Sequence, residues 1–214
     1  MITWTCKGPL AGLALLALAG CTEDGGLALD APSAGKAGTG SAVVIGGGRV
    51  AVSAPSGFCI DPDSVTQSGR ESFAMLARCA NLSPQSALVA LSSQGPAVMT
   101  VTTKPWDLDD TPITADTIAT AYPAGAVAEK RTGTPPMVRA VGTPPSSGLA
   151  EAHWRGAFVV NDQLVVLGLF APEGSRALGA TGANLLTQLA RRTTSASRSL
   201  AAPAAAPVAG KATN

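Results

Sequence analysis

Cysteine offers the widest choice of chemistry in this sequence, which holds four cysteines in 214 residues. Cys59 and Cys79 both lie in apolar surroundings, about 20 positions apart. Redox-active pairs are normally closer together and have cations nearby, and Arg78 is the only neighbouring cation. In an exported protein, two cysteines usually form a disulfide. We therefore predict that Cys59 and Cys79 form a structural disulfide rather than a redox pair.

A second group of reactive types comprises His153, Arg155 and the acidic cluster at residues 107–110. His153 could act as a general base, Arg155 could bind an anion, and the cluster carries three carboxylates. However, the sequence has no G-x-S-x-G nucleophile motif, and calcium loops need more oxygen ligands in a set order. A single histidine and the lack of a CxxC pair exclude a multi-histidine or thiolate metal site. We assign no catalytic residue, cofactor or metal, and keep an enzyme built from these residues as the alternative.

The N-terminal stretch has the features of an export signal. Lys7 supplies a weak positive charge, and residues 10–19 form an apolar run. As a helix this run would span about 15 Å at 1.5 Å per residue, half of a bilayer core of about 30 Å. Residues 1–20 are therefore predicted to be a signal peptide rather than a transmembrane span.

The end of that stretch, Leu18-Ala19-Gly20-Cys21, resembles the lipobox of bacterial lipoproteins. The resemblance implies cleavage before Cys21 and attachment of diacylglyceryl and fatty-acyl (palmitate) chains to that residue. It also implies a lipid anchor in the cell envelope, with the chain facing the periplasm. Thr22 stands where Asp would favour retention in the inner membrane, so the outer membrane is favoured.

Ordinary secretion is the alternative to lipidation, because residues 17–19 also fit an A-x-A cleavage site. That route would leave three cysteines in the mature chain, and hence one free thiol. Residues 21–41 are rich in Gly, Ala, Ser and Asp, as is typical of a flexible tether. The formal net charge is +1, which gives no electrostatic signature for binding nucleic acid.

The first part of the domain reads as a hairpin. Residues 42–45 are β-branched, residues 49–54 alternate polar and apolar, and Gly46 to Gly48 lie between them. The glycines resemble part of a dinucleotide-binding fingerprint, but that motif needs a helix to begin among them. Here a second strand and then Pro55 follow. We therefore predict a glycine hairpin turn.

Periodicity and turn residues place the remaining elements. Residues 73–79 fit both a helix and a strand, and we favour the strand. A strand at 57–60 should end at Asp61-Pro62-Asp63, and residues 137–141 should form an edge strand between prolines. The other expected elements are strands at 97–103, 153–160 and 163–170, the last two joined by Asn161-Asp162, and helices at 83–91, 114–122 and 179–192.

These elements predict one α+β domain at residues 42–192, a mainly antiparallel sheet with hairpins and a C-terminal helix. Residues 193–214, rich in Ala and Pro, should be disordered. Segments 57–61, 73–82 and Trp154-Arg155 with the helix after them resemble a group of short exported bacterial proteins of unassigned function. The arrangement is also similar to the Mog1/PsbP-type α/β/α sandwich, a likeness of fold alone. The expected role is that of a lipid-anchored envelope protein with a binding, scaffolding or accessory function, whose partner is unknown.

Overall fold

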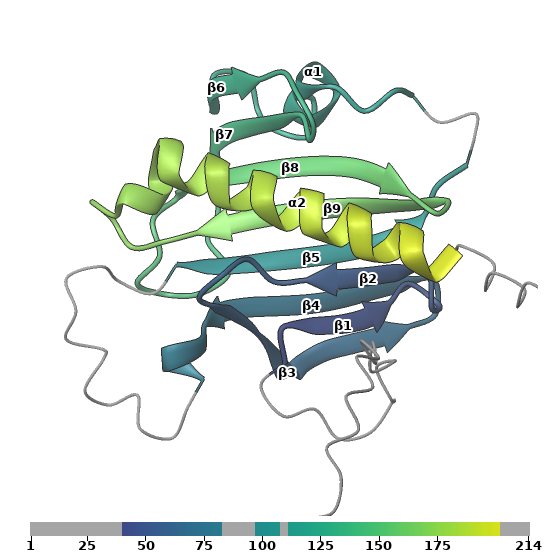
Figure 1. The fold of residues 1–214 in the computed structure, drawn as a ribbon. Helices are drawn as coiled ribbons and strands as arrows, with labels where there is room; N and C mark the ends of the chain where they lie inside the picture. Colours follow the sequence, from purple (N-terminus) through teal and green to yellow (C-terminus); the bar gives the residue numbers. More distant parts are fainter. Residues whose placement is uncertain (1–39, 83–96, 108–110, 202–214) are drawn as a thin grey trace, which may run out of the picture. The chain divides into compact units, whose positions relative to one another are not determined.

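The computed structural model describes residues 40–82, 97–107 and 111–201, which belong to one compact unit (Figure 1). The helix expected at 83–91 and the tether at 21–41, apart from its last two residues, lie outside the described residues. Within this unit, strands dominate and a single long helix, α2 (Ala180–Ala201), follows the last strand.

Seven strands form one antiparallel sheet in the order β3-β4-β5-β9-β8-β7-β6. Their bounds are β3 Phe58–Ser68, β4 Glu71–Arg78, β5 Val98–Pro105, β6 Val127–Arg131, β7 Met137–Val141, β8 Ala152–Val160 and β9 Gln163–Phe170. Two further strands, β1 (Ala42–Ile45) and β2 (Val50–Ser53), pair only with each other. The predicted fold class, an α+β domain with a mainly antiparallel sheet, is confirmed.

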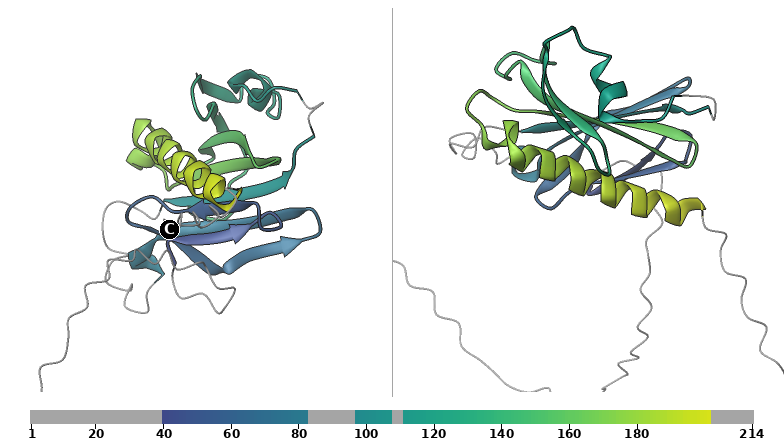
Figure 2. Two further views of the ribbon diagram at one scale, coloured as in Figure 1. Left: turned by 45° about the vertical axis from the view of Figure 1, so that its right-hand side comes forward. Right: turned by 90° about the horizontal axis from the view of Figure 1, so that it is seen from above.

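One face of the sheet is covered by α2 and the β1–β2 hairpin, as Figures 1 and 2 show. The main core lies between these layers, because alternate side chains of each strand point to this face. Its largest fully buried members are Trp154, Ile45, Leu76, Met99, Leu167, Leu169, Leu186 and Leu189. Trp154 donates its indole N–H to the carbonyls of Leu178 and Gly179 at 3.1 Å, so its polar atom is also satisfied.

Both predicted hairpins are present, with the turns that their residues favour. Gly46, Gly47 and Gly48 all have positive φ angles, between 63° and 86°, and join β1 to β2. Asn161 and Asp162 adopt φ angles of 48° and 56° between β8 and β9, the left-handed pair of a two-residue hairpin. The ambiguous segment at 73–79 is a strand, as favoured, because it pairs on both sides within the sheet.

Two predictions about strand ends were wrong. β3 does not end at Pro62 but continues to Ser68 after a register shift between Asp61 and Thr66. An edge strand tolerates a proline and a bulge there because one side of it has no partner. β7 is not an edge strand, because β6 pairs with its outer side. β6 escaped prediction because its sequence, VAEKR, is short and mostly polar.

The predicted domain boundary at Arg192 was also wrong, because α2 continues nine residues further, to Ala201. Thr193 and Ser197 are fully buried on the helix face that Leu186 and Leu189 begin. The Ser197 hydroxyl accepts a hydrogen bond from the Ala51 N–H at 2.9 Å, and the Thr193 hydroxyl accepts one from the Ser53 N–H at 3.3 Å. These side chains thus satisfy the unpaired edge of β2, a role that hydrophobic periodicity cannot reveal. Residues 202–214 of the predicted tail lie outside the described residues.

The predicted disulfide between Cys59 and Cys79 is present, with a sulfur–sulfur distance of 2.05 Å. It joins the start of β3 to the end of β4, next to the backbone hydrogen bond from Cys79 to Gly57. Closing a loop of 20 residues stabilises the fold by about 3 kcal/mol in the chain-entropy treatment. The bond therefore secures the edge strand that carries the proline and the bulge.

Candidate functional site

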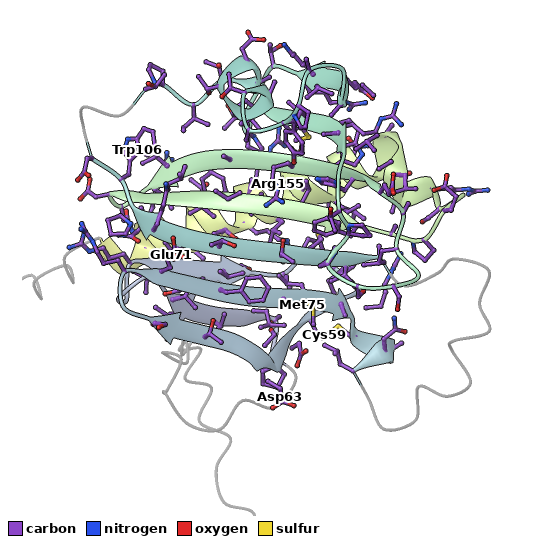
Figure 3. The ribbon with its side chains drawn as sticks, turned by 180° about the vertical axis from the view of Figure 1, so that it is seen from behind. Cys59, Asp63, Glu71, Met75, Trp106 and Arg155 are labelled. Carbon is purple, nitrogen blue, oxygen red and sulfur yellow. A yellow bond between two sulfur atoms is a disulfide. The ribbon has the colours of Figure 1, made fainter. Side chains whose placement is uncertain are left out.

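The second face of the sheet is only partly covered by the described residues. The short helix α1 (Ala115–Ala119) packs there, in an apolar cluster with Val138 and Ala140 of β7. The neighbouring Met137 belongs to the main core on the opposite face, as alternation along a strand requires. Figure 2 shows α1 and α2 on opposite sides of the sheet, and Figure 3 shows the second face with Arg155 labelled on it.

A cavity of about 500 Å³ lies beside α1, over the middle of this face. Its floor is formed by three adjacent strands, through side chains that alternate with the core positions. The lining residues are Ile113, Thr117, Ile118, Ala121 and Tyr122 around α1, Lys104 of β5, Arg155 and Ala157 of β8, and Leu164 and Val166 of β9. Its volume is in the range of about 300–1,000 Å³ that small-molecule sites occupy.

The polar groups in this cavity are few, and its two charged ones are both cations. Arg155 is half-buried among apolar neighbours, and Lys104 is more exposed. No carboxylate is among the described lining residues, and no ion pair joins Arg155 or Lys104 to any described residue. The cavity therefore combines apolar walls with positive charge.

A chain of hydrogen bonds orients Arg155. Because the Glu151 carbonyl can only accept, His153 Nδ1 must carry a proton and donate to it, at 2.9 Å. In a neutral ring Nε2 is then an acceptor, so it receives the Tyr122 hydroxyl, also at 2.9 Å. The Tyr122 oxygen in turn accepts from Arg155 Nε at 3.4 Å, a long hydrogen bond. Arg155 is thus connected through Tyr122 to a buried histidine.

His153 does not serve as the exposed general base that the sequence suggested. It is 3% exposed, stacks against Phe170 at a ring-centroid distance of 4.9 Å, and has both nitrogens engaged. Burial lowers its pKa below the usual 6.5; the Glu151 hydrogen bond opposes this effect, and the nearby Arg155 charge adds to it. His153 therefore acts as a neutral support for Tyr122.

This lowered pKa predicts a pH effect on stability. The unfolded chain takes up a proton at His153 near pH 6.5, whereas the folded chain resists it, so stability is lost as pH falls below about 6.5. His153→Gln removes the titration and keeps an acceptor for Tyr122. Urea unfolding at pH 7.5 and pH 5 should show a larger loss of unfolding free energy in the wild type than in the variant. Parallel pH profiles would show that His153 keeps its ordinary pKa.

The structure brings together His153 and Arg155 but does not join them to the acidic cluster. Leu108 to Asp110 lie outside the described residues, and Asp107 is not among the residues that line the cavity. Across the described ranges, no group of three His, Cys, Asp or Glu side chains is placed to hold a metal ion. No helix in those ranges is long and apolar enough to cross a membrane.

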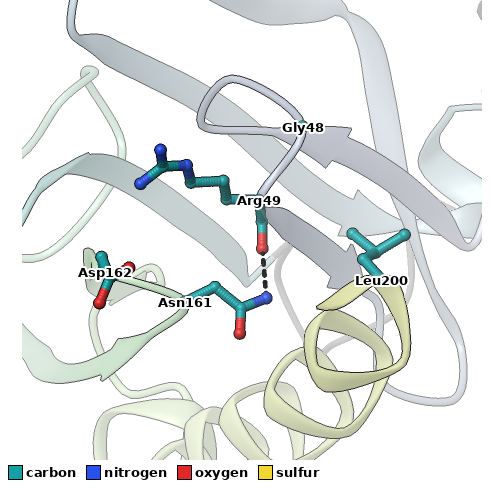
Figure 4. A pocket seen from close by; sticks show the side chains of 5 residues that line it. All are labelled: Gly48, Arg49, Asn161, Asp162 and Leu200. Atoms are coloured by element: carbon teal, nitrogen blue, oxygen red, sulfur yellow. Dashed lines mark hydrogen bonds between the residues drawn. The ribbon is translucent and has the colours of Figure 1, made fainter. Parts of the chain in front are cut away.

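Two other hollows are smaller and have a structural explanation. The first, about 290 Å³, lies between the two hairpin turns and the end of α2 (Figure 4). There Asn161 donates to the carbonyls of Arg49 and Ser197 at 2.9 and 2.7 Å, which ties three segments together. The second, about 370 Å³, lies along α2 near Arg191 and Arg198 and has no chain of buried polar contacts.

Sequence reasoning selected Arg155 but missed Tyr122 and the cavity itself. Tyr122 is the single tyrosine of the chain and directly precedes Pro123, which ends the α1 segment, a signal that could have drawn attention to it. Comparison with known proteins gives no further guide: no family model, curated protein or solved structure matches this chain. The likeness to the Mog1/PsbP-type fold therefore stays a prediction.

Proposed function

We propose that this chain is a lipid-anchored cell-envelope protein whose folded domain binds a small molecule in the cavity beside α1. The anchor is the acylated Cys21, and the domain faces the periplasm, preferentially from the outer membrane. The observation that carries the binding role is the cavity of about 500 Å³ with mostly apolar walls and two cations. Apolar walls with a few convergent polar groups are the usual composition of ligand sites.

Binding is favoured over catalysis because of how the polar groups are used. His153 is buried behind Tyr122, and its two nitrogens are engaged, so it has no free acceptor with which to take a proton from a substrate. No described carboxylate lines the cavity to replace it. A scaffolding or accessory role would leave the enclosed position of Arg155 without an explanation.

Blocking the cavity tests this proposal. Ala121 lies exposed in the turn after α1 and lines the cavity, so Ala121→Trp should fill it without disturbing the core. A library of small fragments should give ligand-observed NMR signals with the wild-type chain, and Ala121→Trp should abolish those of the cavity binders. Ala180→Trp is a matched control, because Ala180 is exposed at the start of α2 on the opposite face. If Ala121→Trp and Ala180→Trp retained every fragment equally, the cavity would not be a binding site.

A further inference from the structure

Arg155 differs from the other half-buried arginines near it. Arg131 and Arg139 both lie within ion-pair distance of Glu129, at 2.8 and 3.5 Å. Arg155 has no such partner among the described residues, and its one hydrogen bond, to Tyr122, uses Nε. A guanidinium has five N–H donors, so the four on its terminal nitrogens have no acceptor in the described chain. These donors belong to a side chain that lines the cavity.

The charge around Arg155 favours an anion. Lys104, on the far side of β9 in the sheet order, adds a second positive charge to the same cavity. A partly buried cation without a counter-ion loses hydration and regains little in return, so a bound anion would offset that cost. A carboxylate matches the planar fork of a guanidinium with two parallel hydrogen bonds.

The rest of the cavity favours an apolar body on the same ligand. Ile113, Ile118, Leu164 and Val166 supply aliphatic walls on both sides of the space. A purely ionic ligand would leave these walls in contact with water, and a purely apolar one would leave Arg155 without an acceptor. One molecule that carries both parts satisfies both surfaces.

Building on the proposed binding function, we propose that the cavity binds a small amphiphile with one carboxylate and a short apolar body. The carboxylate accepts from the terminal N–H groups of Arg155, and the body lies against the aliphatic walls. Tyr122 is a positioning residue, since its contact with Nε restrains the guanidinium before the ligand arrives. A restrained donor loses less side-chain entropy on binding, which strengthens the complex.

Calorimetry with matched probes tests the charge selection. The full-length chain carrying Cys21→Ala, purified without detergent, would be titrated with octanoate and with octanamide, which has the same body but no charge. Octanoate should bind at least about tenfold more tightly, as expected when hydrogen bonds to a charged group are lost. Arg155→Gln should weaken octanoate by a similar factor and leave octanamide unchanged. Arg191→Gln, which removes one exposed positive charge from α2 on the other face, should change neither.

The outcomes separate this inference from the function on which it rests. Equal affinity for octanoate and octanamide, with both lost in Ala121→Trp, would overturn the carboxylate inference and keep the cavity as a binding site. Octanoate binding that survives Ala121→Trp would place the ligand elsewhere and overturn both. A lack of octanoate binding at millimolar concentrations, or full affinity in Arg155→Gln, would overturn the inference.

Discussion

A chain that stops after Arg192 should be much less stable than one that stops after Ala201. The shorter chain loses the last part of α2, including the buried Thr193 and Ser197. The Ala51 and Ser53 amides of β2 then lose their hydrogen-bond acceptors, and Asn161 loses the Ser197 carbonyl. Each buried amide left without a partner costs about 1–3 kcal/mol, so the two together cost about 2–5 kcal/mol.

The measurement is thermal unfolding of both truncated chains and the full chain. For a domain of this size about 1 kcal/mol shifts the melting temperature by about 2–4 °C, so the Arg192 stop should melt about 5–15 °C lower. The Ala201 stop removes only residues 202–214 and should keep the melting temperature of the full chain. Equal melting temperatures for all three chains would show that residues 193–201 contribute nothing to the fold.

A single substitution sharpens the same prediction. Ser197→Ala raises intrinsic helix propensity but leaves the Ala51 N–H without an acceptor. Ser195→Ala makes the same chemical change at an exposed position of the same helix. We expect Ser197→Ala to lower the unfolding free energy by about 1–3 kcal/mol and Ser195→Ala to leave it nearly unchanged. The difference between the two variants isolates the contact with β2 from any effect on the helix itself.

Cys21→Ala should abolish fatty-acid labelling of the protein altogether. The motif Leu18-Ala19-Gly20-Cys21 places the acylated thiol at Cys21, and alanine offers no sulfur for the diacylglyceryl group. Each buried methylene contributes about 0.8 kcal/mol, and two or more acyl chains give stable anchoring. Growth with labelled palmitate, followed by fractionation, should find the wild type in membranes and the variant either unprocessed or released.

Cys6 provides the matched control for this experiment, because it lies in the expected signal segment without the motif. Cys6→Ala should keep both the label and the membrane fraction of the wild type. Extraction with high salt should not release the wild-type protein, since a lipid anchor does not depend on charge. Equal labelling of Cys21→Ala and the wild type would refute the lipoprotein hypothesis and favour ordinary secretion.

The hairpins could be read from the sequence because their signals are local. Asn161-Asp162 and the three glycines at 46–48 tolerate positive φ angles, and alternating apolar residues flank them. The cavity could not be read in this way, since its lining comes from α1 and from β5, β8 and β9. The contact between Tyr122 and His153 spans 31 positions of sequence, and nothing local to either residue specifies it.

The sequence by itself determined the α+β class, most strand positions and the pairing of Cys59 with Cys79, because alternation, turn chemistry and cysteine count are properties of short segments. Only the tertiary structure decided that β6 extends the sheet beyond β7, that α2 continues past Arg192, and that Arg155 lies in a cavity. These outcomes depend on which backbone amides need partners and which side chains share a face after the strands have paired. Thr193 and Ser197 look like part of a polar tail until the free edge of β2 supplies their donors.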